Sequence, residues 1–199
     1  MVASELAFGS DGIPAVTIGT SIGDLRFRGA IDKVDEARDG RLHVTDIKTG
    51  SSSKFKDLSA TNPVENGAKL QLPLYAHAAR ALMNRPHTPV EAHYWFVLRD
   101  DKRVQVPLND AVAATYDRAI SAVVSGIESG HYPQRAPESP DYAYIQCHYC
   151  NPDGLGHVEP RRRWEQIRDH EQLRELIRVI DPDVAARLDA PPSDGDGGE

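Results

Sequence analysis

The amino-acid sequence predicts an α/β fold with a mixed central sheet flanked by helices, followed by a cysteine-containing extension. Two regions, 15–48 and 92–108, show the alternation and β-branched content of strands. Two others, 68–83 and 110–130, repeat apolar residues at helical spacing. With 199 residues, 40% of them hydrophobic and 27% charged, the chain has the size of one buried core. Strands and helices that alternate over one core predict an α/β architecture.

The first strand-forming runs are AVTIG, DLRFRGAIDKV and RLHVTDIK. Asp39-Gly40 lies between the last two runs and is typical of a tight turn, so we expect an antiparallel hairpin there. The polar stretch at 49–67 predicts a mobile loop. A helix is expected over 68–83, with Pro73 in its first turn.

The second group of elements begins with the strand AHYWFVLR, a turn at Asp100-Asp101 and the strand RVQVPL. Together these predict another hairpin. Asn109 or Asp110 is the expected cap of a second helix that ends at Gly130.

The C-terminal third of the chain is predicted to contain less regular secondary structure than the rest. Five prolines and a cysteine pair make residues 131–160 irregular, and a single helix is expected over 161–180. We therefore predict a core at 1–130, a segment at 131–188 that packs on it, and a disordered acidic tail at 189–199.

The composition excludes some classes of protein. No apolar run approaches the ~20 residues that span a bilayer, and the N-terminus lacks the basic start and apolar stretch of a secretory signal, so a cytoplasmic location is expected. A net charge of −7 argues against bulk electrostatic coating of nucleic acid. It is compatible with an enzyme that concentrates carboxylates at a metal site.

Two carboxylates and a lysine form the strongest chemical pattern. Asp32 lies on one predicted strand, and Asp46 and Lys48 lie two residues apart on the strand paired with it. The period of a strand places Asp46 and Lys48 on one face and Ile47 on the opposite face, which we expect to be buried. Oxygen ligands for Mg²⁺ or Mn²⁺ beside a cation are what phosphodiester hydrolysis needs. An Asp-x-Lys pair alone is more often a solvated strand edge.

The three runs GAIDKVDE, VTDIKTG and QLPLYA, in this order, resemble the PD-(D/E)xK nuclease superfamily, and specifically the RecB-type domain at the C-terminus of helicase–nuclease recombination proteins. The resemblance is close over about residues 22–80. CHYCNPDGLG is also similar to the cysteine-containing segment that follows the core in these domains. The resemblance implies a restriction-endonuclease-like core.

The resemblance also implies roles for individual residues. Asp32 and Asp46 would bind Mg²⁺ or Mn²⁺, with the backbone carbonyl of Ile47 as a further ligand. Lys48 would hold the attacking water and stabilise developing charge.

Two helix residues complete the implied site. Gln71 would support it, and Tyr75 would contact Gln71 or the DNA backbone. Other interpretations stay open, because Tyr75 could be a core aromatic residue and Gln71 an N-terminal capping residue.

The sequence departs from the RecB-type pattern upstream of Asp32. Relatives carry a histidine on a helix before the first metal aspartate, and here no histidine precedes Asp32. We therefore expect an N-terminally incomplete nuclease domain that another segment or subunit completes. Glu5, the only upstream glutamate, is a candidate supporting ligand.

The cysteine content departs from the pattern as well. Many relatives hold an iron–sulfur cluster on four cysteines, and this chain has only Cys147 and Cys150, so it cannot supply a complete cluster. Three alternatives remain: a zinc site completed by His157 or His148, a ligand on an absent segment, or packing cysteines.

Two functional hypotheses follow. The first is a metal-dependent deoxyribonuclease, an exonuclease by family resemblance, that works with a helicase in DNA repair or recombination. The second is a non-catalytic DNA-binding or protein-interaction module in which the helix with Arg161, Arg162 and Arg163 contacts phosphate or a partner. A small zinc-binding adaptor is a third possibility that leaves residues 22–80 unexplained.

Overall fold

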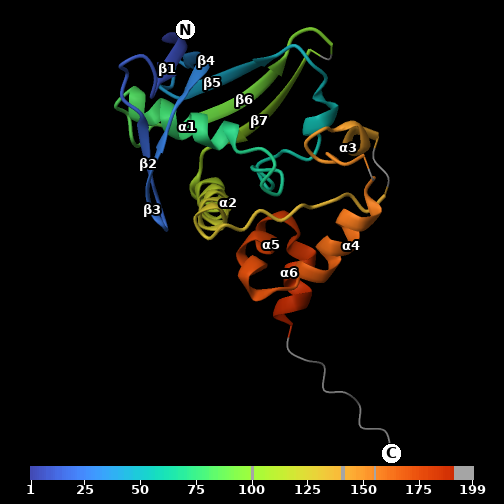
Figure 1. The fold of residues 1–199 in the computed structure, drawn as a ribbon. Helices are drawn as coiled ribbons and strands as arrows, with labels where there is room; N and C mark the ends of the chain where they lie inside the picture. Colours follow the sequence, from blue (N-terminus) through green and yellow to red (C-terminus); the bar gives the residue numbers. More distant parts are fainter. Residues whose placement is uncertain (100, 140–141, 155, 191–199) are drawn as a thin grey trace, which may run out of the picture. The chain divides into compact units, whose positions relative to one another are not determined.

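A computed structural model describes residues 1–99, 101–139, 142–154 and 156–190 of the chain (Figure 1). The chain divides into two compact units, Met1–Ser121 and Ala122–Glu199. Within the described ranges, no helix combines the length and apolar character that crossing a membrane requires.

The first unit alternates strands and helices, as the sequence predicted. In chain order its elements are β1 (Ala3–Phe8), β2 (Val16–Thr20), β3 (Gly23–Phe27), β4 (Gly29–Glu36), β5 (Leu42–Lys48), the 3₁₀ helix η1 (Ser52–Phe55), α1 (Gln71–Leu82), β6 (Val90–Phe96), β7 (Lys102–Pro107) and the start of α2 (Asp110–Glu128).

Five of these strands form one mixed sheet in the order β1-β4-β5-β6-β7. The β5–β6 pair is parallel, and the other neighbours are antiparallel. Parallel neighbours need a crossover connection, and α1 supplies it between β5 and β6 (Figure 1). The predicted α/β fold with a mixed sheet and flanking helices is confirmed.

Both predicted hairpins are present. At Asp39-Gly40 the chain turns between β4 and β5, with Gly40 at φ 82° and the N–H of Ala37 donating to the carbonyl of Arg41 at 2.9 Å. β6 and β7 form the second hairpin. Of its expected Asp100-Asp101 turn, Asp100 lies outside the described residues.

The cap predicted for α2 is also confirmed. The Asn109 side chain accepts a hydrogen bond from the N–H of Val112 at 2.9 Å, which satisfies a free donor in the first turn.

Two features of the N-terminal region differ from the prediction. The run DLRFRGAIDKV is not one strand, because β3 pairs with β2 in a separate two-stranded sheet while β4 pairs with β1 and β5. β1 was not predicted at all. Alternation reveals a strand but not its partner, and β1 shows little alternation because only Phe8 at its end is buried.

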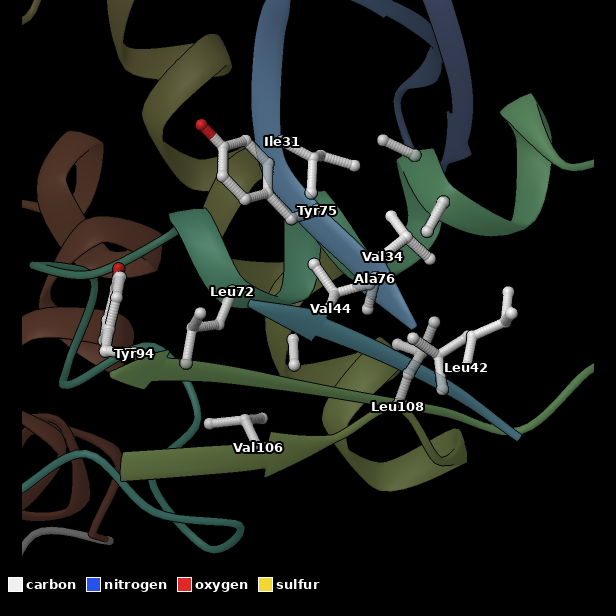
Figure 2. Packing of buried hydrophobic residues seen from close by; sticks show 14 of the residues in the cluster. Ile31, Val34, Leu42, Val44, Leu72, Tyr75, Ala76, Tyr94, Val106 and Leu108 are labelled. Carbon is white, nitrogen blue, oxygen red and sulfur yellow. The ribbon is translucent and has the colours of Figure 1, made fainter. Parts of the chain in front are cut away.

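The core of this unit lies between α1 and the sheet. Leu72 and Ala76 of α1 face the sheet near Val44 (Figure 2). The helix begins at Gln71 instead of Ala68, because the preceding residues form a turn in which the N–H of Lys69 donates to the carbonyl of Val64 at 2.9 Å. Pro73 lies in the first turn, as expected, where its missing N–H leaves no bond unmade.

The segment between β5 and α1 is more ordered than its polar composition predicted. It contains η1, and it buries Leu58 and Val64, which are 5% and 2% exposed. Phe55 packs partly buried against the core. These three apolar side chains anchor a loop that was expected to be mobile.

The second unit contains the end of α2 and several short helices. They are α3 (Tyr142–Gln146), α4 (Val158–Ile167), η2 (Glu171–Leu173), α5 (Arg174–Ile180) and α6 (Pro182–Asp189). Trp164, Leu173, Ile177 and Val184 form its buried core with Ala185.

The single helix predicted over 161–180 is therefore wrong. From Ile167 to Leu173 is a step of six residues, which turns an α-helix by about 240° and carries Leu173 away from the stripe of Trp164 and Ile167. The chain bends at this point, so both apolar groups reach one core. α6 continues to Asp189, and residues 191–199 of the expected tail lie outside the described ones. That 131–188 packs on the first unit stays a prediction.

Candidate active site

Asp46 is the most buried charged residue of the predicted site, at 4% exposure. It lies on β5 with Leu42 and Val44, whose face packs against the core, and Ile47 points the other way with 42% exposure. The expectation that Ile47 would be buried is wrong, because α1 covers the face that carries Asp46. The carboxylate thus lies at the end of the apolar core.

Asp32 lies beside Asp46 on the neighbouring strand. The β4–β5 register pairs Lys33 with Thr45, so Asp32 and Asp46 are the next residues along the two strands. Asp32 Oδ2 accepts a hydrogen bond from the N–H of Ile47 at 2.7 Å. This bond fixes one carboxylate oxygen and ties β4 to β5 at the site.

Lys48 forms an ion pair with Asp46, with Nζ 2.6 Å from Oδ2. This ion pair is the contact that the buried Oδ2 makes, and among the described residues no further donor reaches it. Burial raises the pKa of Asp46, Lys48 lowers it in part, and the charge of Asp32 adds to the rise. Burial of a charged oxygen without a donor is costly unless a cation compensates it.

These features fit a divalent cation. Two carboxylates on adjacent strands provide hard oxygen donors, and Asp46 Oδ2 has no partner among the described residues other than the Lys48 ammonium. Asp32 and Asp46 are the residues that would hold the ion.

Gln71 connects the lysine to α1. Its Oε1 accepts a hydrogen bond from Lys48 Nζ at 3.4 Å, and its Nε2 donates to the Tyr75 hydroxyl at 3.0 Å. The helix cap is Leu70 without a side-chain bond, so Gln71 does not cap α1. The structure therefore brings Asp32, Asp46, Lys48, Gln71 and Tyr75 together, and their catalytic roles stay predictions.

Tyr75 combines the two interpretations left open by the sequence. It is buried at 9% exposure and packs edge to face against Phe8 at 6.5 Å, as a core aromatic residue does. Its hydroxyl also contacts Gln71, and burial raises its pKa, so it remains a neutral phenol.

The sequence interpretation missed Tyr94 and Phe55. Tyr94 lies opposite Asp46 in the parallel β5–β6 register and is 2% exposed. Phe55 lies on η1, with its ring 4.8 Å from that of Tyr94. No local sequence pattern could reveal that Tyr94 lies beside Asp46 or that Phe55 packs on Tyr94, because these residues are far apart in the chain. Asp46 and Tyr94, for example, are 48 positions apart.

Glu5, the upstream candidate, lies on β1 with a left-handed φ of 49°. It sits between the β1 residues that pair with Lys33 and Ile31, and thus across from Asp32. Its side chain is exposed. Within the described ranges no three His, Cys, Asp or Glu side chains gather as metal ligands, so Glu5 does not join the two aspartates.

Cys147 and Cys150 form a tight turn in the second unit. Their Sγ atoms are 2.7 Å apart, and the N–H of Cys150 donates to Cys147 Sγ at 3.1 Å. Hydrogen bonds from Cys150 lower the pKa of the Cys147 thiol, and the same contact raises the pKa of the Cys150 thiol. Among the residues that the structure describes, neither His157 nor His148 completes a three-ligand group with them.

The arginines at the start of α4 are paired with acidic side chains. Arg161 contacts Glu165, and both Arg162 and Arg163 contact Glu159, at 2.9 Å and 3.3 Å. Their charges are compensated locally, which weakens the case for a phosphate-binding helix.

A mixed sheet that places two carboxylates and a lysine side by side on adjacent strands defines a class of α/β proteins equipped for metal-dependent phosphodiester hydrolysis. A model of the PD-(D/E)XK nuclease superfamily matches residues 1–153, and the chain belongs to this superfamily. Membership implies nuclease activity, and these nucleases generally use divalent metal ions such as Mg²⁺. No curated protein matches the chain.

Proposed function

We propose that this chain is a Mg²⁺- or Mn²⁺-dependent deoxyribonuclease, and an exonuclease that works with a helicase in DNA repair or recombination. Superfamily membership supports the nuclease. The RecB-type resemblance of 22–80 supports the finer parts. One observation carries the catalytic proposal: Asp46 is buried beside Asp32, and among the described residues its Oδ2 is paired with the ammonium of Lys48 alone.

In this proposal each residue has a distinct task. Asp32 and Asp46, with the carbonyl of Ile47, hold the ion, and a bound divalent cation would supply charge neutralisation and activation of water. Lys48 orients the attacking water and stabilises negative charge on the phosphate. Gln71 holds Lys48, and Tyr75 holds Gln71.

The alternative is a non-catalytic DNA-binding or protein-interaction module on the same fold. Such a module has no need for a buried carboxylate beside a second one, since burial and the charge of Asp32 raise the pKa of Asp46 and Lys48 offsets this only in part. The local pairing of Arg161, Arg162 and Arg163 further favours the catalytic proposal.

The test is degradation of end-labelled linear DNA with Mg²⁺ or Mn²⁺. We expect the wild-type chain to cut and the Lys48→Ala variant to cut at least about 100-fold more slowly, because a preorganised cation is lost from the transition state. Lys33→Ala is the matched control, since Lys33 pairs with Asp35 at the surface and its loss should leave the rate within about twofold.

Circular DNA separates the two modes of cutting. An exonuclease leaves it intact, whereas nicking would replace the exonuclease proposal with an endonuclease. A wild-type chain that cuts nothing with either metal would contradict the nuclease proposal.

We also propose that Cys147 and Cys150 supply two thiolates of a zinc site, with His157 or His148 as a further ligand after a side-chain movement. The hydrogen-bonded turn, which brings the two sulfur atoms together, supports this. Metal analysis of freshly purified protein should find about one zinc per chain, and less in Cys150→Ser. Equal zinc in both, or none in the wild type, would rule the site out.

A further inference from the structure

One side chain in contact with Lys48 has no role in the proposed site. Tyr94 is 2% exposed and lies opposite Asp46 in the β5–β6 register. Its pKa is raised, first by burial and then by the charge of Asp46, so the phenol stays neutral and can donate a hydrogen bond.

Tyr94 is linked to Lys48 directly through its ring and indirectly through Gln71. The ammonium Nζ lies 4.9 Å from the centre of the Tyr94 ring, within the range of a cation–π interaction. The Tyr94 hydroxyl donates to Gln71 Oε1 at 3.1 Å, and the same oxygen accepts from Lys48 at 3.4 Å. Ring and hydroxyl together restrict where the ammonium can lie.

Phe55 supports the ring of Tyr94 from the segment between β5 and α1. The two rings are 4.8 Å apart with an interplanar angle of 60°, and Phe55 also contacts Phe96 at 5.3 Å. Lys69 Nζ lies 4.7 Å from the centre of the Phe55 ring. The segment is thereby joined to the site through aromatic contacts.

We propose that Tyr94 is a positioning residue for Lys48: its ring holds the ammonium directly, and its hydroxyl holds it through Gln71. This inference rests on the proposed nuclease function. Because Tyr94 is almost fully buried, it does not contact DNA, and its loss should lower kcat without changing KM for DNA.

Two substitutions separate the two contacts. Tyr94→Phe keeps the ring and loses the hydroxyl, so we expect kcat to fall about fivefold. Tyr94→Leu loses both contacts, so we expect a fall of about fiftyfold. In both variants KM for DNA should stay within about twofold of wild type.

Tyr116→Leu is the matched control for loss of a buried tyrosine. Tyr116 is 1% exposed in the same unit and contacts His77, with no part in the proposed site. Its kcat should stay within about twofold of wild type. Equal losses of kcat in Tyr94→Leu and Tyr116→Leu would reduce Tyr94 to a packing role, and a raised KM with unchanged kcat would make it a substrate contact.

A second readout needs neither metal nor DNA. An aromatic ring under the lysine side chain shifts the NMR signals of the Lys48 ε-CH₂ group upfield. We expect Tyr94→Phe and Tyr116→Leu to keep this shift and Tyr94→Leu to lose it. Persistence of the shift in Tyr94→Leu would overturn the proposal.

The two readouts distinguish the failure of this inference from that of the proposed function. No cleavage by wild-type protein contradicts the nuclease, and the NMR shift then still decides whether Tyr94 holds Lys48. Cleavage that is insensitive to Tyr94→Leu keeps the nuclease and removes the positioning role.

Discussion

The Asp46→Asn variant is expected to lose at least about 1,000-fold in metal-dependent DNA cleavage, because the buried ligand for the cation is removed. The same variant should be at least as stable as wild type at pH 7 without metal. The folded pKa of Asp46 is raised above its ordinary value of 3.8, chiefly by burial. The ionised carboxylate therefore costs stability, a penalty that is present above the raised pKa and absent below 3.8.

Urea unfolding with and without Mg²⁺ measures this effect independently of activity. Mg²⁺ should stabilise the wild-type chain by binding to its folded state and should not stabilise Asp46→Asn. A large loss of stability in metal-free Asp46→Asn would mean that the carboxylate serves the fold instead of a cation.

Asp35→Asn is the control of opposite sign. Asp35 lies on the same sheet, and hydrogen bonding from Lys33 lowers its pKa, so its charge stabilises the folded state. The variant should lose up to about 1 kcal/mol of stability and keep full activity. If both substitutions inactivate the protein, the loss of activity in Asp46→Asn does not support a role for Asp46 as a ligand of the cation.

The Trp164→Ala variant is expected to lose about 3–5 kcal/mol of the free energy of unfolding of the second unit. Trp164 is 2% exposed and packs with Leu173, Ile177 and Val184. Its removal leaves a cavity among short helices that have little stability of their own. Hydrogen exchange should show the amides of α5 and α6 losing protection.

Trp95→Ala is the matched control, since the chain contains two tryptophans. Trp95 is partly exposed on β6, where it contacts Arg103 at 5.0 Å and donates to Asp101 at 3.3 Å. Its loss should cost about 1–2 kcal/mol. If protection in α5 and α6 survives Trp164→Ala, the second unit does not depend on this core.

Much of the secondary structure follows from local chemistry. Asp39-Gly40 predicts its hairpin because glycine adopts the left-handed conformation that the turn requires. Asn109 predicts the start of α2 because its side chain can bond to a free N–H three residues on. The prediction of a single helix over 161–180 was wrong, because the apolar residues before and after residue 170 would lie on different faces of one continuous helix.

Part of the candidate site also follows from local sequence patterns. Asp32, Asp46 and Lys48 could be selected because their residue types and spacing on paired strands are visible in the sequence. The contact between Gln71 and Tyr75 follows from their spacing of four residues on a helix.

The sequence by itself determined the strands that carry the carboxylates, the turn that pairs them and the superfamily to which they belong. Only the tertiary structure decided that Asp46 faces the core and Ile47 faces outward, because α1 covers one side of β5. The same structure placed Tyr94 beside Lys48 through the parallel β5–β6 pairing. Turns and helix caps depend on neighbours in the chain, whereas burial and strand partnership depend on distant residues that share no local pattern.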